Sequence, residues 1–320
     1  MISASGLAKS YTVRRGRERV QVDAVSDATF EVAEGEIVSF LGPNGAGKTT
    51  TLRMLTTLTP PSAGSARVAG QDIVDRPREV RRQIGYVSQS GSAGGFAKAG
   101  DEIVDRALLY GLDAATATRR ARALLERLDL PDVWTRVPRS LSGGQRRRLD
   151  VVMGLVHQPR LLFLDEPTAG LDPQARANLW GHIRELREEY GMTVFLTTHY
   201  LDEADMLSDR VIVFDHGRVV TADTPGALKD RISGDLVEVE VADPEQVDAA
   251  VRVVEKAAAD KPAVTGLRIA GRVHRSGTVL PGLTRELDAA GVELVSLEVR
   301  RPTLDDVFLT LTGRSLRDAR

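Results

Sequence analysis

The segment from Gly42 to Thr49 reads GPNGAGKT and has the residue types of a phosphate-binding loop. It follows the apolar run EIVSFL (36–41) and precedes TTLRMLTTL, whose leucines recur at helical spacing, so we expect a strand, a loop and a helix. Its glycines can wrap backbone N–H groups around a phosphate, and the helix N-terminus adds positive potential. Lys48 would reach the β- and γ-phosphates, and Thr49 would bind Mg²⁺. The alternative, a flexible surface loop, does not account for this strand-to-helix context.

Two adjacent carboxylates, Asp165 and Glu166, follow the buried-strand pattern LLFL (161–164). A core strand carries such residues only where it emerges at an edge. Asp165 suits a magnesium shell, which leaves Glu166 to orient and polarise water against the γ-phosphate. A solvated acidic turn explains the two residues equally well when they are taken alone, and the phosphate loop favours the catalytic interpretation.

Isolated polar residues end two further predicted strands, Gln89 after IGYVS (84–88) and His199 after TVFLTT (193–198). In open parallel sheets the ligand lies at the carboxyl edge, so these four polar strand ends should converge on one place. A single histidine is more often structural than functional. The convergence of strand ends favours a functional role for His199.

The LSGGQ segment (141–145) precedes a helix-like run from Arg146 to His157. Ser142 can cap that helix, and Ser142, Gly143 and Gly144 could expose N–H groups as a second anion site. A glycine-rich capping turn without a ligand explains the same residues equally well.

The amino-acid composition of the chain is that of an ordinary globular protein. The chain has 320 residues, 42% hydrophobic and 28% charged, with 43 basic and 45 acidic side chains and no cysteine. This length predicts two domains, and the absence of cysteine excludes disulfides and thiolate metal sites. Arginine-rich stretches at 14–19, 76–82 and 146–148 are scattered and balanced by acids, so we interpret them as ordinary surface charge and expect no nucleic-acid partner. No apolar run approaches the ~20 residues that span a bilayer, and the N-terminus lacks a secretory signal pattern.

Alternating strand and helix patterns predict an α/β first domain over residues 1–233, with a small antiparallel β-layer and a mainly parallel sheet. About 70 residues without a strong strand signal separate two of its strands, which predicts a helical subdomain over about 90–158. Residues 234–320 follow a β-α-β-β-α-β order and predict a small α+β domain of ferredoxin-like arrangement.

The order GPNGAGKT, Gln89, LSGGQ, LLFLDEP, AGLD (169–172) and His199 resembles the nucleotide-binding domains of ABC ATPases. The resemblance covers about residues 1–230 and implies a P-loop NTPase fold whose domains form a head-to-tail homodimer around two ATP molecules. It implies that His199 contacts the γ-phosphate, that Gln89 senses Mg²⁺ and a membrane partner, and that Asp172 communicates across the interface. Tyr11 is similar to the aromatic residue that stacks on adenine, although an edge-strand tyrosine is the plain alternative.

The resemblance therefore predicts three sets of site residues. The ATP set is Tyr11, Gly42, Asn44, Gly45, Gly47, Lys48, Thr49, Thr50 and Gln89, with Lys48, Glu166 and His199 catalytic. The magnesium set is Thr49, Gln89 and Asp165. The set that touches the ATP of the opposite subunit is Ser142, Gly143, Gly144 and Gln145.

The tail and the stretches TTTLRMLTTL and YLDEADMLSDR are similar to the daunorubicin-resistance type of ATP-binding subunit. This resemblance implies a Mg-ATP-hydrolysing subunit at the cytoplasmic face of the cell membrane that powers export of a drug, antibiotic or lipid through a separate polytopic permease. The alternative is a soluble ABC ATPase switch that regulates a protein or nucleic-acid partner without transport.

Overall fold

The computed structural model describes residues 1–16, 18–94, 96–232, 234–274 and 276–313. The chain divides into two compact units, with the boundary between Pro225 and Gly226. This boundary lies eight residues before the division after residue 233 that the sequence predicts.

A ten-stranded sheet forms the centre of the first unit, in the order β5-β4-β1-β2-β10-β9-β3-β8-β7-β6. Strands β3, β8, β7 and β6 run parallel, and β9 runs parallel to β3. Their short apolar runs are buried on both faces, as parallel strands covered by helices require. The strands of this sheet are β1 (Ile2–Arg15), β2 (Glu18–Val32), β3 (Ile37–Leu41), β4 (Ala63–Val68), β5 (Gln71–Asp72), β6 (Ile84–Val87), β7 (Leu161–Asp165), β8 (Thr193–Thr198), β9 (Arg210–Asp215) and β10 (Arg218–Asp223).

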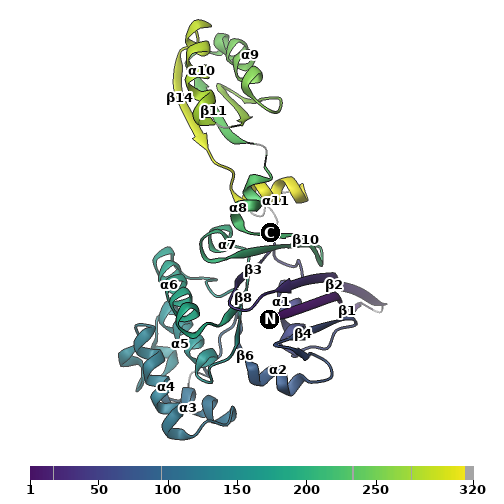
Figure 1. Cartoon of the computed structure of the whole chain (residues 1–320), viewed down its shortest axis with the longest axis vertical. Helices are drawn as coiled ribbons and strands as arrows, with labels where there is room; N and C mark the ends of the chain where they lie inside the picture. Colours follow the sequence, from purple (N-terminus) through teal and green to yellow (C-terminus); the bar gives the residue numbers. More distant parts are fainter. Residues whose placement is uncertain (17, 95, 233, 275, 314–320) are drawn as a thin grey trace. The chain divides into compact units, whose positions relative to one another are not determined.

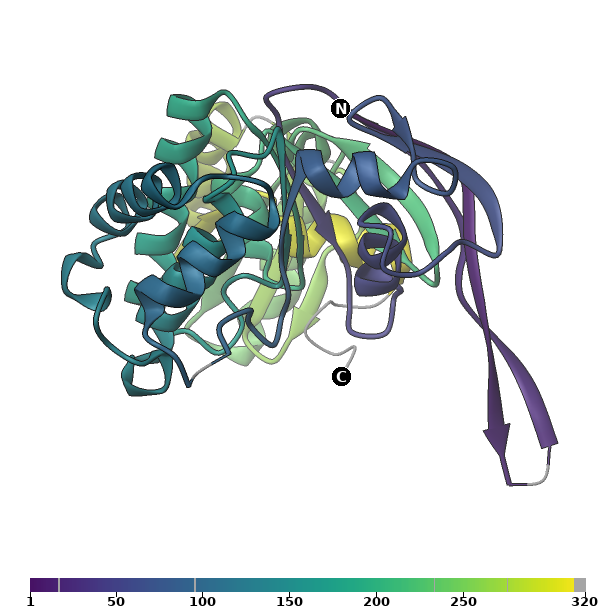
Figure 2. The same ribbon diagram turned by 90° about the horizontal axis from the view of Figure 1, so that it is seen from below.

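On the other side of the sheet, β1 pairs antiparallel with β2 and β4. These strands form the small β-layer that the alternation of residues 28–32 predicts. β1 pairs with both β2 and β4, but its pairing with β4 ends at Ala8, whereas its pairing with β2 continues to Arg15. The far part of this hairpin extends away from the rest of the first unit, as Figure 2 shows. The sequence pattern did not predict a hairpin of this length.

Helices cover both faces of the sheet, and α3, α4 and α5 gather on one side of the first unit (Figure 1). They form the predicted helical subdomain, because no strand occurs between β6 and β7 among the residues described there. The helices of this unit are α1 (Lys48–Leu55), α2 (Pro77–Gln83), α3 (Ala99–Leu109), α4 (Ala114–Arg127), α5 (Gly143–Leu155), α6 (Pro173–Tyr190) and α7 (Leu201–Leu207). α8 (Pro225–Asp230) begins at Pro225, directly before the boundary between the two units.

The core has one apolar cluster on each face of the central strands. On β7, Leu162 and Leu164 pack toward the helical subdomain, while Leu161 and Phe163 pack toward α1 and β2. This alternation follows from the two-residue period of a strand. A rigid double-sided core therefore supports the ends of β3, β7 and β8.

The second unit contains a four-stranded antiparallel sheet in the order β12-β13-β11-β14. Its elements are β11 (Asp235–Val241), α9 (Val247–Ala257), β12 (Ala263–Thr265), β13 (Arg268–Val273), α10 (Ser276–Ala289), β14 (Leu294–Arg300) and α11 (Leu304–Thr312). Up to β14 this is the predicted β-α-β-β-α-β order. Alternate valines of β11, such as Val237 and Val239, are fully buried in its core.

Within the described parts of the chain, no helix is both long enough and apolar enough to cross a bilayer.

Candidate functional site

The GPNGAGKT loop connects β3 to α1, and two of its three glycines, Gly42 and Gly47, stand where a side chain would not fit. A Cβ atom on Gly42 would lie 2.1 Å from the carbonyl oxygen of Phe214. A Cβ on Gly47 would lie 2.3 Å from the carbonyl oxygen of Ala24, and the φ angle of Gly47 is 105°. No side chain caps the first turn of α1, so its N–H groups are available to an anion.

A cavity of about 490 Å³ opens over this loop at the carboxyl ends of the parallel strands. It brings together residues from β2, the loop, the ends of β6, β7 and β8, and the first turn of α1. Its lining is Ala24, Asn44, Gly45, Gly47, Lys48, Thr49, Thr50, Gln89, Glu166, Ala169 and His199. The predicted convergence of strand ends is therefore present in the structure.

Glu166 lines this cavity, and its carboxylate has polar contacts to three other side chains. Gln89 Nε2 donates a hydrogen bond to Glu166 Oε2 at 2.9 Å. His199 Nδ1 lies 3.3 Å and Lys48 Nζ 3.5 Å from Glu166 Oε1. The backbone N–H of Glu166 donates to Thr197, and Glu166 has a φ angle of 46°, a conformation that non-glycine residues seldom adopt.

Burial and neighbouring charges determine whether the carboxylate of Glu166 is ionised. Burial alone would raise the pKa of Glu166, but the nearby His199 ring and the positive charge of Lys48 outweigh burial and hold the pKa below its ordinary value. Burial lowers the pKa of Lys48, and the charges of Glu166 and Asp165 oppose that shift. The carboxylate of Glu166 is thus ionised at neutral pH.

Lys48 Nζ also donates to two carbonyl oxygens of its own loop, those of Gly42 at 2.7 Å and Pro43 at 3.0 Å. The ammonium group therefore lies inside the loop, where a phosphate would be held. Since the side chain is 4% exposed, its charge faces the cavity rather than bulk solvent.

Asp165 lies beside the loop, where Thr49 Oγ1 donates to its Oδ1 at 3.0 Å and Thr197 Oγ1 donates to the same atom at 2.7 Å. Hydroxyl, carboxylate and amide oxygens are the ligands that Mg²⁺ prefers, and Mg²⁺ usually binds through one or two carboxylates plus phosphate oxygens. Thr49, Asp165 and the nearby Gln89 fit that donor set.

The LSGGQ segment lines a separate cavity of about 340 Å³ with the AGLD segment and the start of α6. Ser142 caps α5, as predicted, by accepting from the backbone N–H of Gln145 at 3.2 Å, and Gln145 Oε1 accepts from the N–H of Ser142 at 3.1 Å. Asp172 caps α6 through the N–H of Ala175 at 2.8 Å. None of these residues lines the cavity of Lys48 and Glu166.

Comparison with known proteins identifies this arrangement. Residues 25–169 match the sequence model of the family described as ABC transporter. The chain is 41% identical to the daunorubicin resistance ATP-binding protein DrrA2 of Streptomyces coeruleorubidus, over 96% of this chain and 94% of that protein. The chain belongs to the ABC transporter family.

Two further comparisons, one with a relative and one with a solved structure, support the fold and the ATPase activity of this ABC chain. It is 38% identical to the doxorubicin resistance ATP-binding protein DrrA of Mycobacterium tuberculosis, over 94% of this chain and 92% of that one. The ATP-binding cassette MJ0796, solved as a dimer in a post-hydrolysis state with ADP and Pi, superposes with a TM-score of 0.63 at 26% identity, over 70% of this chain and 98% of the cassette. The chain is an ABC ATPase, and it binds ATP.

Tyr11 is one ATP-site residue that the structure leaves outside the cavity lining. It lies on the β1–β2 hairpin opposite Val22, it is 38% exposed, and Lys9 Nζ lies 5.3 Å from its ring centre. Ala24, two residues after Val22, does line the cavity. Adenine stacking on Tyr11 stays a prediction.

Three supporting residues of this ABC site were not predicted from the sequence. Thr197 contacts both Asp165 and Glu166, Glu203 of α7 is fully buried, and Arg147 is buried two residues after the LSGGQ segment. The interpretation of residues 146–148 as ordinary surface charge is wrong for Arg147, which is 7% exposed. A buried threonine at a strand end is a weak sequence signal, and nothing in the run RRR distinguishes its middle arginine.

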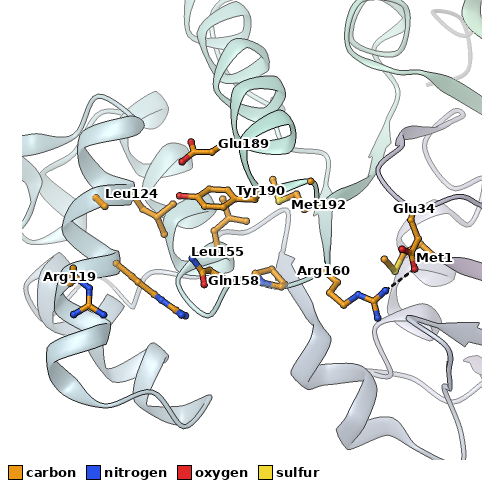
Figure 3. Close-up of a pocket in the computed structure, with 14 residues that line it drawn as sticks. Met1, Glu34, Arg119, Leu124, Leu155, Gln158, Arg160, Glu189, Tyr190 and Met192 are labelled. Carbon is orange, nitrogen blue, oxygen red and sulfur yellow. Dashed lines mark hydrogen bonds and ion pairs between the residues drawn. The ribbon is translucent and has the colours of Figure 1, made fainter.

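A larger cavity, of about 750 Å³, lies at the opposite ends of β7 and β8 (Figure 3). Leu124, Leu155 and Met192 give it apolar walls, and an ion pair between Arg160 and Glu34 lies at its edge. No residue of the phosphate loop or of the LSGGQ segment lines it. The candidate nucleotide site is therefore not the larger of these two cavities but the one at which the polar strand ends converge.

Proposed function

We propose that this chain is the ATP-hydrolysing subunit of an ABC exporter and that it works as a homodimer on a separate polytopic membrane permease. The observation that carries the proposal is the presence of two complementary half-sites in separate cavities, which share no lining residue. A head-to-tail pair with twofold symmetry would apply the LSGGQ segment of each protomer to the nucleotide held by the other. This chain carries the residues of both proposed half-sites, which supports a dimer of two identical protomers.

In the proposed mechanism the phosphates of ATP lie on the N-terminus of α1. Lys48 exchanges its loop carbonyl partners for the β- and γ-phosphate oxygens. Glu166 orients and polarises the attacking water, while His199 and Gln89 hold Glu166 and the γ-phosphate in line. Mg²⁺, held by Thr49, Asp165 and Gln89, would supply charge neutralisation on the phosphates.

The second ATP contact belongs to the partner protomer. Ser142, Gly143, Gly144 and Gln145 present a capped helix N-terminus, whose N–H groups suit a γ-phosphate. Asp172 lines the same cavity, which supports its proposed role in communication across the dimer interface.

We propose that this ATPase powers export because relatives that align with nearly the whole chain are named for resistance to daunorubicin and doxorubicin. We infer that the exported molecule is a drug, an antibiotic or a lipid. The chain would then lie at the cytoplasmic face of the membrane, held there by the permease. No specific observation favours the alternative of a soluble switch without transport.

Membrane capture tests this proposal. The native complex is extracted from membranes with mild detergent, and the tagged ATPase is purified with whatever polytopic protein accompanies it. We expect a membrane protein to co-purify and to stimulate ATP hydrolysis. If the ATPase fractionates wholly as cytosol and captures no polytopic protein, transport is the wrong function.

We also propose that residues 1–233 form the nucleotide-binding domain and that residues 234–320 form an accessory domain that supports assembly or regulation. The separate apolar core of the second unit supports this division. Deleting residues 236–320 should change ATPase activity or assembly with the permease. Normal transport by the truncated chain would reduce this part to a passive appendage.

A further inference from the structure

Arg147 lies on the second turn of α5 and connects three separate segments of backbone. Its Nε donates to the carbonyl oxygen of Pro167 at 2.7 Å, and its Nη2 donates to that of Asp165 at 2.9 Å. Its Nη1 donates to the carbonyl oxygen of Ser88 at 2.6 Å. Hydrogen bonds from a charged donor in a buried environment are among the stronger ones in proteins.

The carbonyl groups that Arg147 holds flank the catalytic side chains. Asp165 and Pro167 are the two sequence neighbours of Glu166, and Ser88 directly precedes Gln89. Gln89 in turn donates to Glu166 at 2.9 Å. A shift of the Arg147 guanidinium would therefore displace Glu166 and the residue that orients it.

Asp150, one turn further along α5, holds the segment after Gln89. Its Oδ1 accepts from the backbone N–H groups of Ser92 at 2.6 Å and Ala93 at 3.1 Å. It is 2% exposed, and its Oδ2 lies 4.0 Å from Arg147 Nη1. The helix that begins at Ser142 thus holds the backbone on both sides of Gln89.

We propose that Arg147 is a positioning residue that couples the LSGGQ segment of a protomer to Glu166 and Gln89 of the same protomer. The inference rests on the proposed head-to-tail dimer, in which that LSGGQ segment touches the ATP of the other protomer. Engagement of ATP at one site moves α5 as a rigid element, and Arg147 carries the movement to the base of the second site. The two sites of the dimer are coupled by this route.

An arginine suits this position because its planar guanidinium carries five N–H donors in a fixed fork. Lysine carries its three donors on a single atom, so it lacks the separate Nε, Nη1 and Nη2 groups that each bind one of the three carbonyl oxygens. Glutamine offers one amide group and removes the charge. Replacement by either residue should loosen the link to Glu166 and Gln89, while the phosphate loop, which Arg147 does not contact, keeps its structure.

A double-mutant cycle on ATP hydrolysis tests the coupling in the full-length chain. The four proteins are the wild type, Arg147→Gln, Gln89→Ala and the double variant, each measured for kcat and KM. We expect Arg147→Gln to lower kcat about tenfold or more, because a small misplacement of a catalytic group is costly, while KM stays within about threefold. We expect the double variant to lose little beyond the more damaging single change, since both act through the position of Glu166.

Arg187→Gln is the matched control. Arg187 donates to the carbonyl oxygen of Gly35 at 2.7 Å, but it lies on α6 and outside both half-sites. Its loss should leave kcat within about twofold of the wild type, which separates coupling from the general effect of removing an arginine that holds backbone.

Three results would overturn the assignment of Arg147. These are an unchanged kcat in Arg147→Gln, an equal loss in Arg187→Gln, and losses in the double variant that multiply as independent effects would. If Arg147→Gln does not fold, Arg147→Lys replaces it in the same cycle. ATP-trapped dimer formation by Glu166→Gln is independent of Arg147, so its failure would count against the dimer, whereas a failed cycle with an intact dimer would count against the coupling alone.

Discussion

His199 Nδ1 lies 3.3 Å from Glu166 Oε1, although the two residues end different strands and are separated by more than thirty positions in the chain. β7 and β8 are parallel neighbours in full register, so their carboxyl ends meet at the same edge of the sheet. This register places the histidine beside the carboxylate of Glu166, which is the arrangement that its proposed contact with the γ-phosphate requires.

Changing Glu166 to Gln should separate binding from hydrolysis. The amide keeps the size of the side chain but cannot act as a base, so we expect turnover to fall about 100-fold or more while ATP still binds. Turnover and nucleotide affinity are measured side by side, with Glu185→Gln on the exposed face of α6 as the control. Wild-type turnover in Glu166→Gln would rule out Glu166 as the base.

Lys48→Ala should weaken nucleotide binding. The ammonium group lies between the loop carbonyls and Glu166, and its loss removes a charge-assisted contact worth about 1.5–3 kcal/mol, or roughly 10- to 100-fold in affinity. Fluorescent-nucleotide titration measures this change. An affinity equal to that of the wild type would refute the assignment of Lys48 to the phosphates.

His157 should make stability depend on pH. Its ring stacks on Tyr110 with centroids 3.7 Å apart, and Nε2 donates to the carbonyl oxygen of Ile84. Burial, aided by the charges of Arg106 and Arg120, lowers the pKa of His157 to about 4. The unfolded chain takes up this proton near pH 6.5 and the folded chain does not, so stability is lost as pH falls from about 6.5 toward 4, by up to about 3 kcal/mol.

Thermal melts across that range test the effect of His157. His157→Gln should flatten the pH dependence, whereas His216→Gln, at an exposed position, should leave the dependence of the wild type. Identical slopes in all three proteins would show that His157 does not control it.

Glu203 should tolerate a neutral isostere. It is fully buried, and its Oε1 accepts from Thr168 Oγ1 and Trp180 Nε1, both at 3.0 Å. Burial raises the pKa of Glu203 against these hydrogen bonds, which favours the neutral acid. We expect Glu203→Gln to change the free energy of unfolding by less than about 1 kcal/mol and Glu203→Leu to lower it by about 1–3 kcal/mol for each orphaned donor.

Urea unfolding of the two Glu203 variants distinguishes these cases. Equal destabilisation by Gln and Leu would mean that the fold needs an ionised carboxylate at this position.

The parts of the site that follow from local sequence were predictable. Lys48 and Thr49 belong to one contiguous motif, and the buried runs before Asp165 and His199 predict strands whose ends must converge. Parallel pairing then places all of them in one cavity. The same reasoning predicts the cap at Ser142, because a serine before two glycines and a helical run is a common N-terminus.

Residues that act through tertiary packing were not predictable. Arg147 has arginine on both sides, and only the packing of α5 against β6 and β7 decides which of the three is buried. The length of the β1–β2 hairpin depends on pairing between strands rather than on periodicity within either one. The boundary near Pro225 depends on which residues contact each other within each unit, and amino-acid composition indicates such contacts only weakly.

Mixing two inactive variants tests the central claim most directly. Glu166→Gln removes the base, and Ser142→Arg blocks the LSGGQ segment, so each homodimer should be inactive. If each ATP site combines Glu166 of one protomer with Ser142 of the other, a heterodimer keeps one intact site. A 1:1 mixture assembled before ATP is added should then regain up to about one quarter of wild-type ATPase activity. No recovery in a mixture that forms heterodimers would contradict the composite site.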